Sequence, residues 1–174
     1  SQSAHGQALS EDREDLPGCA QCHTAHTIEL PGSTKFHLSS PQLCLHCHGD
    51  KEMMERHGLA TSIAETYLAD FHGVSASMAD AETVTPDEVV VVCVDCHGLH
   101  DVPRMKDGGA EKLKANLQVV CAECHQDASA SFPDAWMSHY RPTLEHAPLV
   151  FGVKTLYQIF IPFVIVGLLI QIFA

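Results

Sequence analysis

Aromatic and basic residues are both scarce in this sequence. Only 6% of its 174 residues are Phe, Trp or Tyr, and Trp136 is the single tryptophan. So few rings make a thin core, and we expect something other than side chains to supply part of the apolar volume. Ten Lys and Arg against 22 Asp and Glu leave a net charge of −12. Phosphate binding needs clustered basic residues, so the composition argues against a nucleic-acid partner.

Cysteine and histidine are abundant instead, with eight and 13 copies. Every cysteine belongs to one of four Cys-x-x-Cys-His groups: Cys19-Ala-Gln-Cys22-His23, Cys44-Leu-His-Cys47-His48, Cys93-Val-Asp-Cys96-His97 and Cys121-Ala-Glu-Cys124-His125. Two thiols three positions apart lie on one side of a helical turn and reach the two vinyl groups on one porphyrin edge. The next residue, a histidine, then ligates the iron as its proximal ligand. The pattern predicts four covalently bound c-type haems.

Three other interpretations explain less. A zinc site of paired Cys-x-x-Cys units accounts for the thiols but not for the histidine after every pair. A thioredoxin-like pair accounts for one group and needs a βαβ context that is absent. Disulfides within the groups would be strained. Because c-type haems are mostly attached after export, we expect a signal peptide to have been removed ahead of Ser1, with the haems on the periplasmic, outer side of a membrane.

The four groups form two similar halves. In each half a His-Gly pair precedes the groups, and a further histidine follows the first group at the same offset. These are His5-Gly6 and His26 in the first half, and His72-Gly73 and His100 in the second. The sequence thus predicts two repeated dihaem units, at about 5–57 and 72–139. Trp136-Met-Ser-His139 is a partial echo of the His-Gly segment.

Each iron needs a sixth ligand, or it is open to a substrate. The repeat gives five distal candidates for four positions: His26, His72, His100, His139 and His5. His37, His46, His57 and His146 are weaker candidates, because they do not recur with the repeat. Methionine would raise the reduction potential, but none of the five methionines recurs either. We therefore expect bis-histidine coordination and low potentials.

Three segments resemble parts of the low-potential multihaem c-type cytochromes: Asp70-Phe-His-Gly73, Cys93-Val-Asp-Cys-His-Gly-Leu-His-Asp101 and Phe132-Pro-Asp-Ala-Trp-Met-Ser-His139. The similar members are membrane-bound and lie beside, or continue into, a cytochrome b-like membrane domain. The resemblance covers nearly all of the chain. It implies distal-ligand roles for these histidines and an integral-membrane partner that is quinone-reactive or cytochrome b-like. Tetrahaem quinol dehydrogenases are also similar, although their single anchor is typically N-terminal.

The expected fold is mainly α and irregular, with short helices and loops wrapped around the haems. A capping box formed by Thr61-Ser62 and Glu65 predicts a helix over 62–71 that delivers His72. A second helix is predicted over 110–120. The segment 89–92 is a strand or a helical turn, and Thr85-Pro86 with Glu88 favours a helix start. Residues 24–43 and 98–109 are expected to be loops.

The C-terminal segment differs in kind. From Leu149 to Ala174 the only charged residue is Lys154, and about 20 apolar residues suffice to span a membrane as a helix. We therefore predict a tetrahaem domain at 1–148 and a transmembrane helix at 149–174. The alternative is a buried helix of a soluble protein. The polypeptide is expected to continue, or a partner to complete the bundle, because the helix lacks basic stop-transfer residues.

These features predict electron transfer by a membrane-anchored subunit of a respiratory complex, rather than an enzyme acting on its own. It would link the quinone pool to a periplasmic or outer redox partner. The alternative is a multihaem oxidoreductase that reduces a small nitrogen or sulfur oxyanion at one open haem. Such an enzyme needs basic residues near that haem to attract the anion, and the surplus histidines and net charge argue against it. A haem-bearing assembly module would share every motif.

Overall fold

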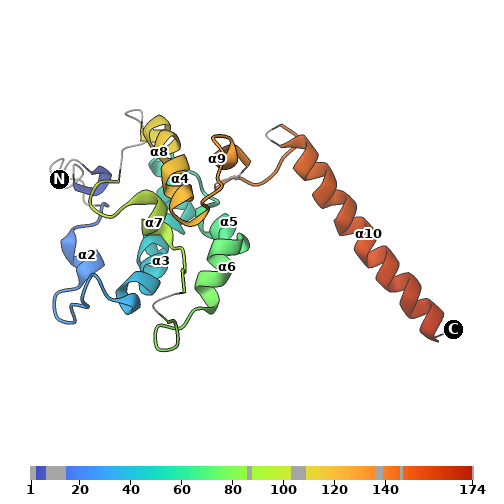
Figure 1. Cartoon of the computed structure of the whole chain (residues 1–174), viewed down its shortest axis with the longest axis horizontal. Coiled ribbons are helices and arrows are strands. Elements are labelled where there is room, and N and C mark those ends of the chain that lie inside the picture. Colours follow the sequence, from blue (N-terminus) through green and yellow to red (C-terminus); the bar gives the residue numbers. More distant parts are fainter. Residues whose placement is uncertain are drawn as a thin grey trace. The chain divides into compact units, whose positions relative to one another are not determined.

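The computed structural model describes residues 3–6, 15–85, 88–102, 109–135, 139–145 and 147–173. Over these ranges the chain is helical or irregular and contains no strand. It divides into two compact units, Ser1–His139 and Tyr140–Ala174 (Figure 1). The mainly α and irregular fold class predicted from the sequence is thereby confirmed. The first unit ends at His139, whereas the sequence predicts the end of the haem domain at residue 148.

The first and third Cys-x-x-Cys-His groups each form a five-residue helix, α2 (Cys19–His23) and α7 (Cys93–His97). A side chain within each group accepts a hydrogen bond from the backbone N–H just before the helix. Gln21 Oε1 accepts from Gly18 at 2.9 Å, and Asp95 Oδ2 accepts from Val92 at 2.7 Å. These bonds satisfy N–H groups at the helix start that would otherwise lack an acceptor.

Both short helices end at a residue with positive φ. Thr24 has φ 55° after α2, and Gly98 has φ 72° after α7. A left-handed residue directs the chain away from the helix axis, which suits a helix that must stop at its histidine. The first group of each predicted repeat unit therefore forms a helix of the same length, with the same kind of start and the same kind of end.

The second and fourth groups lie instead at the C-terminal ends of long helices, α3 (Thr34–His48) and α8 (Gly109–Cys124). The predicted loop over 24–43 is wrong from Thr34 onward, because Ser33 caps α3 by accepting a hydrogen bond from the Phe36 N–H at 3.1 Å. The predicted helix over 110–120 is confirmed, and α8 continues through Cys124. Of the predicted loop over 98–109, the described residues 98–102 are non-helical.

The helix predicted over 62–71 is two helices, α5 (Ile63–Ala69) and α6 (Phe71–Met78). Asp70 separates them, because its Oδ1 accepts from the Phe71 N–H at 2.6 Å and starts a new helix. The predicted capping box is also wrong. Ser62 precedes α5 without a side-chain cap and donates its hydroxyl to the His139 carbonyl at 2.8 Å.

The segment 88–92 is irregular, so neither the helix nor the strand considered for it forms. Two further short helices of the first unit are α4 (Lys51–Arg56) and α9 (Phe132–Ala135). Among the described residues, the buried apolar side chains are few: Phe36, Met54, Val92 and Leu117. So small an apolar interior is expected where a bound group rather than side chains fills the core.

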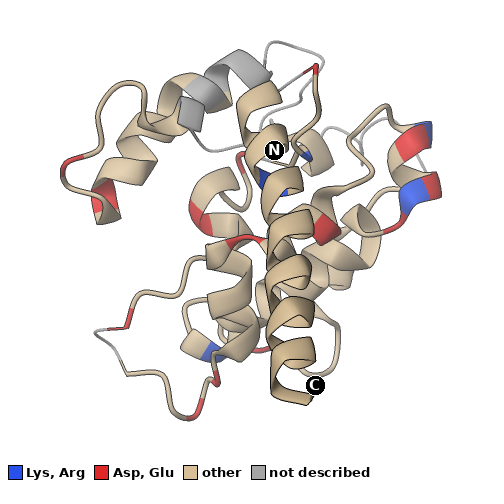
Figure 2. Cartoon of the chain, turned by 90° about the vertical axis from the view of Figure 1, so that its right-hand side faces the viewer, with Lys and Arg blue, Asp and Glu red and all other residues tan. Residues whose placement is uncertain are grey.

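The second unit consists mainly of α10 (Pro148–Phe173), a helix of 26 residues that runs through Pro162. It is long and apolar enough to cross a membrane, and none of its most apolar stretch is buried against protein. Figure 2 shows α10 without acidic residues along its length. At about 1.5 Å per residue the helix measures about 39 Å, which exceeds the roughly 30 Å of a hydrocarbon core.

Candidate haem-binding site

None of the eight cysteines forms a disulfide. Each pair lies within one helical turn or at the end of one, so both sulfurs of a pair are available to a single porphyrin edge. Among the described residues, no three His, Cys, Asp or Glu side chains converge as ligands of a bare metal ion would. In this part of the chain, histidine side chains instead lie opposite one another in pairs.

Four histidine pairs form, and each joins the histidine of one Cys-x-x-Cys-His group to a histidine from elsewhere in the chain. The pairs, with their ring-centroid separations, are His23 with His100 at 5.9 Å, His48 with His5 at 6.1 Å, His97 with His139 at 6.0 Å, and His125 with His72 at 6.3 Å. Four of the five distal candidates are thus each opposite a different proximal histidine.

The separation itself is informative. Imidazole nitrogens bind a metal at about 2 Å. Two imidazoles on opposite sides of one iron therefore have centroids about 6 Å apart, with the porphyrin plane between them. All four pairs fit one iron between two rings.

His5 and His72 are presented in the same way. Ser3 Oγ accepts from the Gly6 N–H at 3.0 Å, and His5 lies inside the turn that this bond closes. Asp70 caps α6, and His72 occupies the corresponding position in its first turn. The glycine after His72 has a packing reason, because a Cβ at Gly73 would collide with the Tyr67 carbonyl. The His-Gly pattern therefore marks a capped turn, which at Gly73 also packs tightly on its neighbour.

His139 is held by α5. The Thr66 hydroxyl lies 3.5 Å from His139 Nδ1, and the Ser62 hydroxyl donates to the His139 carbonyl. Because Nδ1 faces Thr66, Nε2 is the nitrogen left to face His97. The sequence shows the Ser62 hydroxyl but does not show its partner, because His139 lies 77 positions further along the chain.

Burial affects the imidazoles of the pairs at the second and third groups. Burial lowers the pKa of His5 and of His97. Burial, followed by nearby His5 and His97, lowers the pKa of His48. Burial, followed by His97 and His48, lowers the pKa of His139. A lowered pKa favours neutral imidazole, which is the form that ligates a metal.

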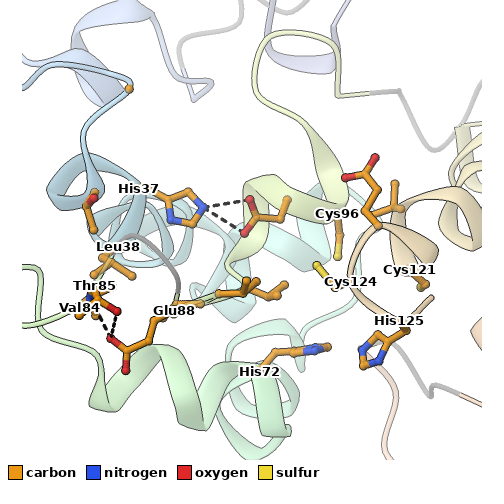
Figure 3. Close-up of a pocket in the computed structure, with 18 of the residues that line it drawn as sticks. His37, Leu38, His72, Val84, Thr85, Glu88, Cys96, Cys121, Cys124 and His125 are labelled. Atoms are coloured by element: carbon orange, nitrogen blue, oxygen red, sulfur yellow. Dashed lines mark hydrogen bonds and ion pairs between the residues drawn. The ribbon is translucent and has the colours of Figure 1, made fainter. Parts of the chain in front are cut away.

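A cavity of about 760 Å³ adjoins the fourth group. It is lined by Cys121, Cys124, His125 and His72, and Figure 3 shows the two histidines facing each other across one side of it. Phe132 lies against His125, with ring centroids 5.1 Å apart. The volume is within the roughly 300–1,000 Å³ typical of cofactor sites. The donor set, the histidine spacing and this space all fit haem.

The remaining histidines lie outside the four pairs. His26 has the same offset as His100 and is exposed like it, but only His100 lies opposite an attachment-group histidine. His37 Nε2 contacts both carboxylate oxygens of Asp95, at 2.9 and 3.1 Å. His57 Nε2 contacts Asp15 at 2.8 Å, and His46 is exposed on α3. His146 and Trp136 lie outside the described residues.

Residues 10–53, which include the first two groups, match a family model described as the doubled CXXCH motif. The doubled motif indicates a multihaem c-type cytochrome. Covalent haem c binding and electron transfer follow for this chain from the matched motif and the geometry around it. No curated protein and no solved structure matches the chain.

Proposed function

We propose that the chain is a tetrahaem cytochrome, anchored in a membrane by α10, that passes electrons between the quinone pool and a periplasmic or outer redox partner as part of a respiratory complex. When bound, haem supplies one-electron chemistry at iron. The cysteine sulfurs would attach the haem, the paired imidazoles would ligate its iron, and burial would help to set its potential.

The observation that carries the proposal is the set of four histidine pairs at 5.9–6.3 Å. Each group of the sequence has its own distal imidazole, so every iron would be six-coordinate. An enzyme that reduces an oxyanion needs one iron with a single protein ligand, and the pairs leave no group in that state. The geometry therefore favours electron transfer over the oxyanion reductase.

The membrane side of the proposal rests on α10. Its apolar side chains are exposed along its length, and so large an apolar surface requires a lipid or protein neighbour. The helix contains neither histidine nor carboxylate. It offers no ligand for a b-type haem and no proton acceptor for quinol oxidation, so an integral-membrane partner would carry the quinone chemistry.

The test is reduction of the haems in native membranes by a menaquinol or ubiquinol analogue. We expect all the c-type haem of the full chain to be reduced, and the reduction to stop when a quinone-site inhibitor is added. Purified chain without its partner should be reduced by dithionite and not by the quinol. Haem that dithionite reduces but quinol does not, in intact membranes, would contradict the link to the quinone pool.

A further inference from the structure

The outward side of α6 carries the largest apolar side chains of that helix. Phe71 is 78% exposed, Val74 is 40% exposed and Met78 is 75% exposed. Their spacing of three and four residues places them on one side of the helix. The opposite side contains buried Gly73, which packs on α5 (Figure 1). A helix at a protein surface normally turns its apolar side inward, so this side of α6 is suited to a neighbouring molecule.

This exposed side is distinct from the haem-binding site. His72 lies opposite His125 and lines the cavity beside the fourth group, whereas Phe71, Val74 and Met78 do not line it. One side of α6 therefore presents an imidazole of the fourth pair, and another side faces outward. A molecule bound to the outward side would be separated from His72 by about the width of one helix, roughly 10 Å.

The part of the chain that contains α6 is acidic. No Lys or Arg occurs between Arg56 and Arg104, so this stretch contributes −8 to the net charge of −12. Lys35 of α3 lies near Glu82, but its ammonium group is already paired with Glu29 at 2.6 Å. Charge of one sign over so long a stretch attracts basic molecules and repels acidic ones. The eight acidic residues of the stretch are Glu65, Asp70, Asp80, Glu82, Asp87, Glu88, Asp95 and Asp101.

Acidic residues stand at both ends of the exposed apolar row. Asp70 directly precedes Phe71, and the exposed residues Asp80 and Glu82 follow Met78. The outward side of α6 together with these three acidic residues is called the α6 surface below. An apolar centre with a charged rim is the usual composition of a surface that binds another protein.

The charge of the rim decides which kind of molecule fits the α6 surface. An anionic lipid surface would be repelled. A second copy in a two-fold contact would bring the same carboxylates against each other, which is unfavourable. A protein with Lys or Arg side chains around an apolar centre is complementary in both respects. Redox proteins exchange electrons through small interfaces of this kind.

We propose that the α6 surface is the docking site of a basic redox protein, whose Lys or Arg side chains surround an apolar centre. This rests on the proposed function and names the chemistry of the redox partner that it requires. In the docked complex one electron passes between the two proteins, so that one protein is oxidised as the other is reduced. The fourth group lies nearest to the partner, because α6 carries its distal candidate His72.

The test measures electron exchange between the haem-loaded full chain, in detergent, and a lysine-rich monohaem cytochrome c. The chain is reduced with dithionite, freed of excess reductant and mixed with the oxidised probe in a stopped-flow instrument. The same cytochrome c with acetylated lysines is the control probe. We expect the native probe to be reduced about tenfold faster than the acetylated one at low salt, and high salt to remove the difference.

A matched pair of charge variants tests the rim. Asp80→Asn with Glu82→Gln removes two charges from the α6 surface, whereas Glu52→Gln with Glu55→Gln removes two exposed charges from α4. We expect the first double variant to slow the exchange about threefold to tenfold at low salt, and the second to change it by less than about twofold. Equal slowing would show that only total charge matters and would overturn the proposal.

A second pair of variants tests the apolar centre. Met78→Gln makes it polar, and Leu30→Gln is the control because Leu30 is 72% exposed elsewhere in the chain. We expect Met78→Gln alone to slow the exchange, at low and at high salt, with an unchanged haem absorption spectrum. Equal rates for the two variants would overturn the proposal. A change from dimer to monomer in light scattering of Met78→Gln would also overturn it, since the α6 surface would then join two copies.

Failure of the proposed function would look different. Quinol would then not reduce the haem in native membranes, although the dithionite-reduced chain would still exchange electrons with the probe. Quinol reduction that persists while the α6 variants behave like their controls would overturn the docking site alone.

Discussion

The imidazole of His100 lies opposite that of His23, with ring centroids 5.9 Å apart, although the two histidines belong to different halves of the predicted repeat. His26, which has the corresponding position in the first half, is exposed like His100 but lies in none of the four pairs. In the proposed tetrahaem cytochrome, the second half would provide the distal ligand of the first haem, whereas the second and fourth haems would take theirs from the His-Gly turn of their own half.

This difference between two equivalent positions predicts opposite effects of the same substitution. We expect His100→Met to convert one of four bis-histidine haems to histidine–methionine ligation and to raise its potential. His26→Met is the matched control and should leave all four haems unchanged. Near-infrared magnetic circular dichroism distinguishes the two ligand sets. A ligand change in the His26 variant, without one in the His100 variant, would reverse the assignment.

The close contact at Gly73 predicts sensitivity to a single methyl group. Gly73→Ala should push α6 away from the Tyr67 carbonyl, and overpacking of this kind costs about 1–3 kcal/mol. Because α6 carries His72, the fourth haem should lose part of its low-spin character. Gly32→Ala is the control, since a Cβ there meets no atom within 4 Å. The high-spin fraction in the absorption spectrum measures the effect, and equal spectra of the two variants would refute it.

The hydroxyl beside His139 predicts an effect on the third haem. Thr66→Val removes the oxygen that lies 3.5 Å from His139 Nδ1 and donates to the Ser62 carbonyl at 2.7 Å. Loss of one such hydrogen bond costs about 0.5–1.5 kcal/mol. The His139 ring would also be held less firmly in its orientation toward His97. We expect a changed electron paramagnetic resonance signal for one haem, with recovery in Thr66→Ser. An unchanged spectrum in the valine variant would show that α5 does not position His139.

The apolar helix predicts membrane attachment of the haem-loaded chain. Ile161→Lys places a charge near the middle of α10, at a cost of about 2.5–3.5 kcal/mol if that position lies at the bilayer centre. We expect the variant to move partly from the membrane to the soluble fraction with its haem absorption unchanged, whereas Ile161→Leu stays in the membrane. Equal partitioning of both variants would show that α10 does not insert.

Local patterns determined what could be predicted from the sequence. The Cys-x-x-Cys-His groups are recognised by spacing within five residues, and α10 is recognised by a continuous apolar run. Both can therefore be predicted from the sequence. The start of α3 at Thr34 is not predicted from the sequence, because Pro41 inside this helix lacks a backbone N–H and argues against a helix. The break at Asp70 was missed because its side chain competes for the backbone with the predicted helix.

The pairing of histidines depends on contacts between distant parts of the chain, which periodicity does not encode. The repeat places His26 and His100 at equivalent positions and so predicts the same ligand role for both. Only the three-dimensional arrangement distinguishes them. The same holds for Ser62, whose hydroxyl donates to the His139 carbonyl and does not accept a hydrogen bond from the helix that it precedes. Side chains that position the ligand histidines are therefore the hardest to predict from the sequence.

The most direct test of four haems between four histidine pairs is the near-infrared magnetic circular dichroism intensity of the oxidised full chain, normalised to protein. The account predicts four low-spin bis-histidine haems for each chain, with no high-spin contribution and no histidine–methionine band. Fewer than four bis-histidine equivalents, or one high-spin haem with an open coordination site, would contradict it.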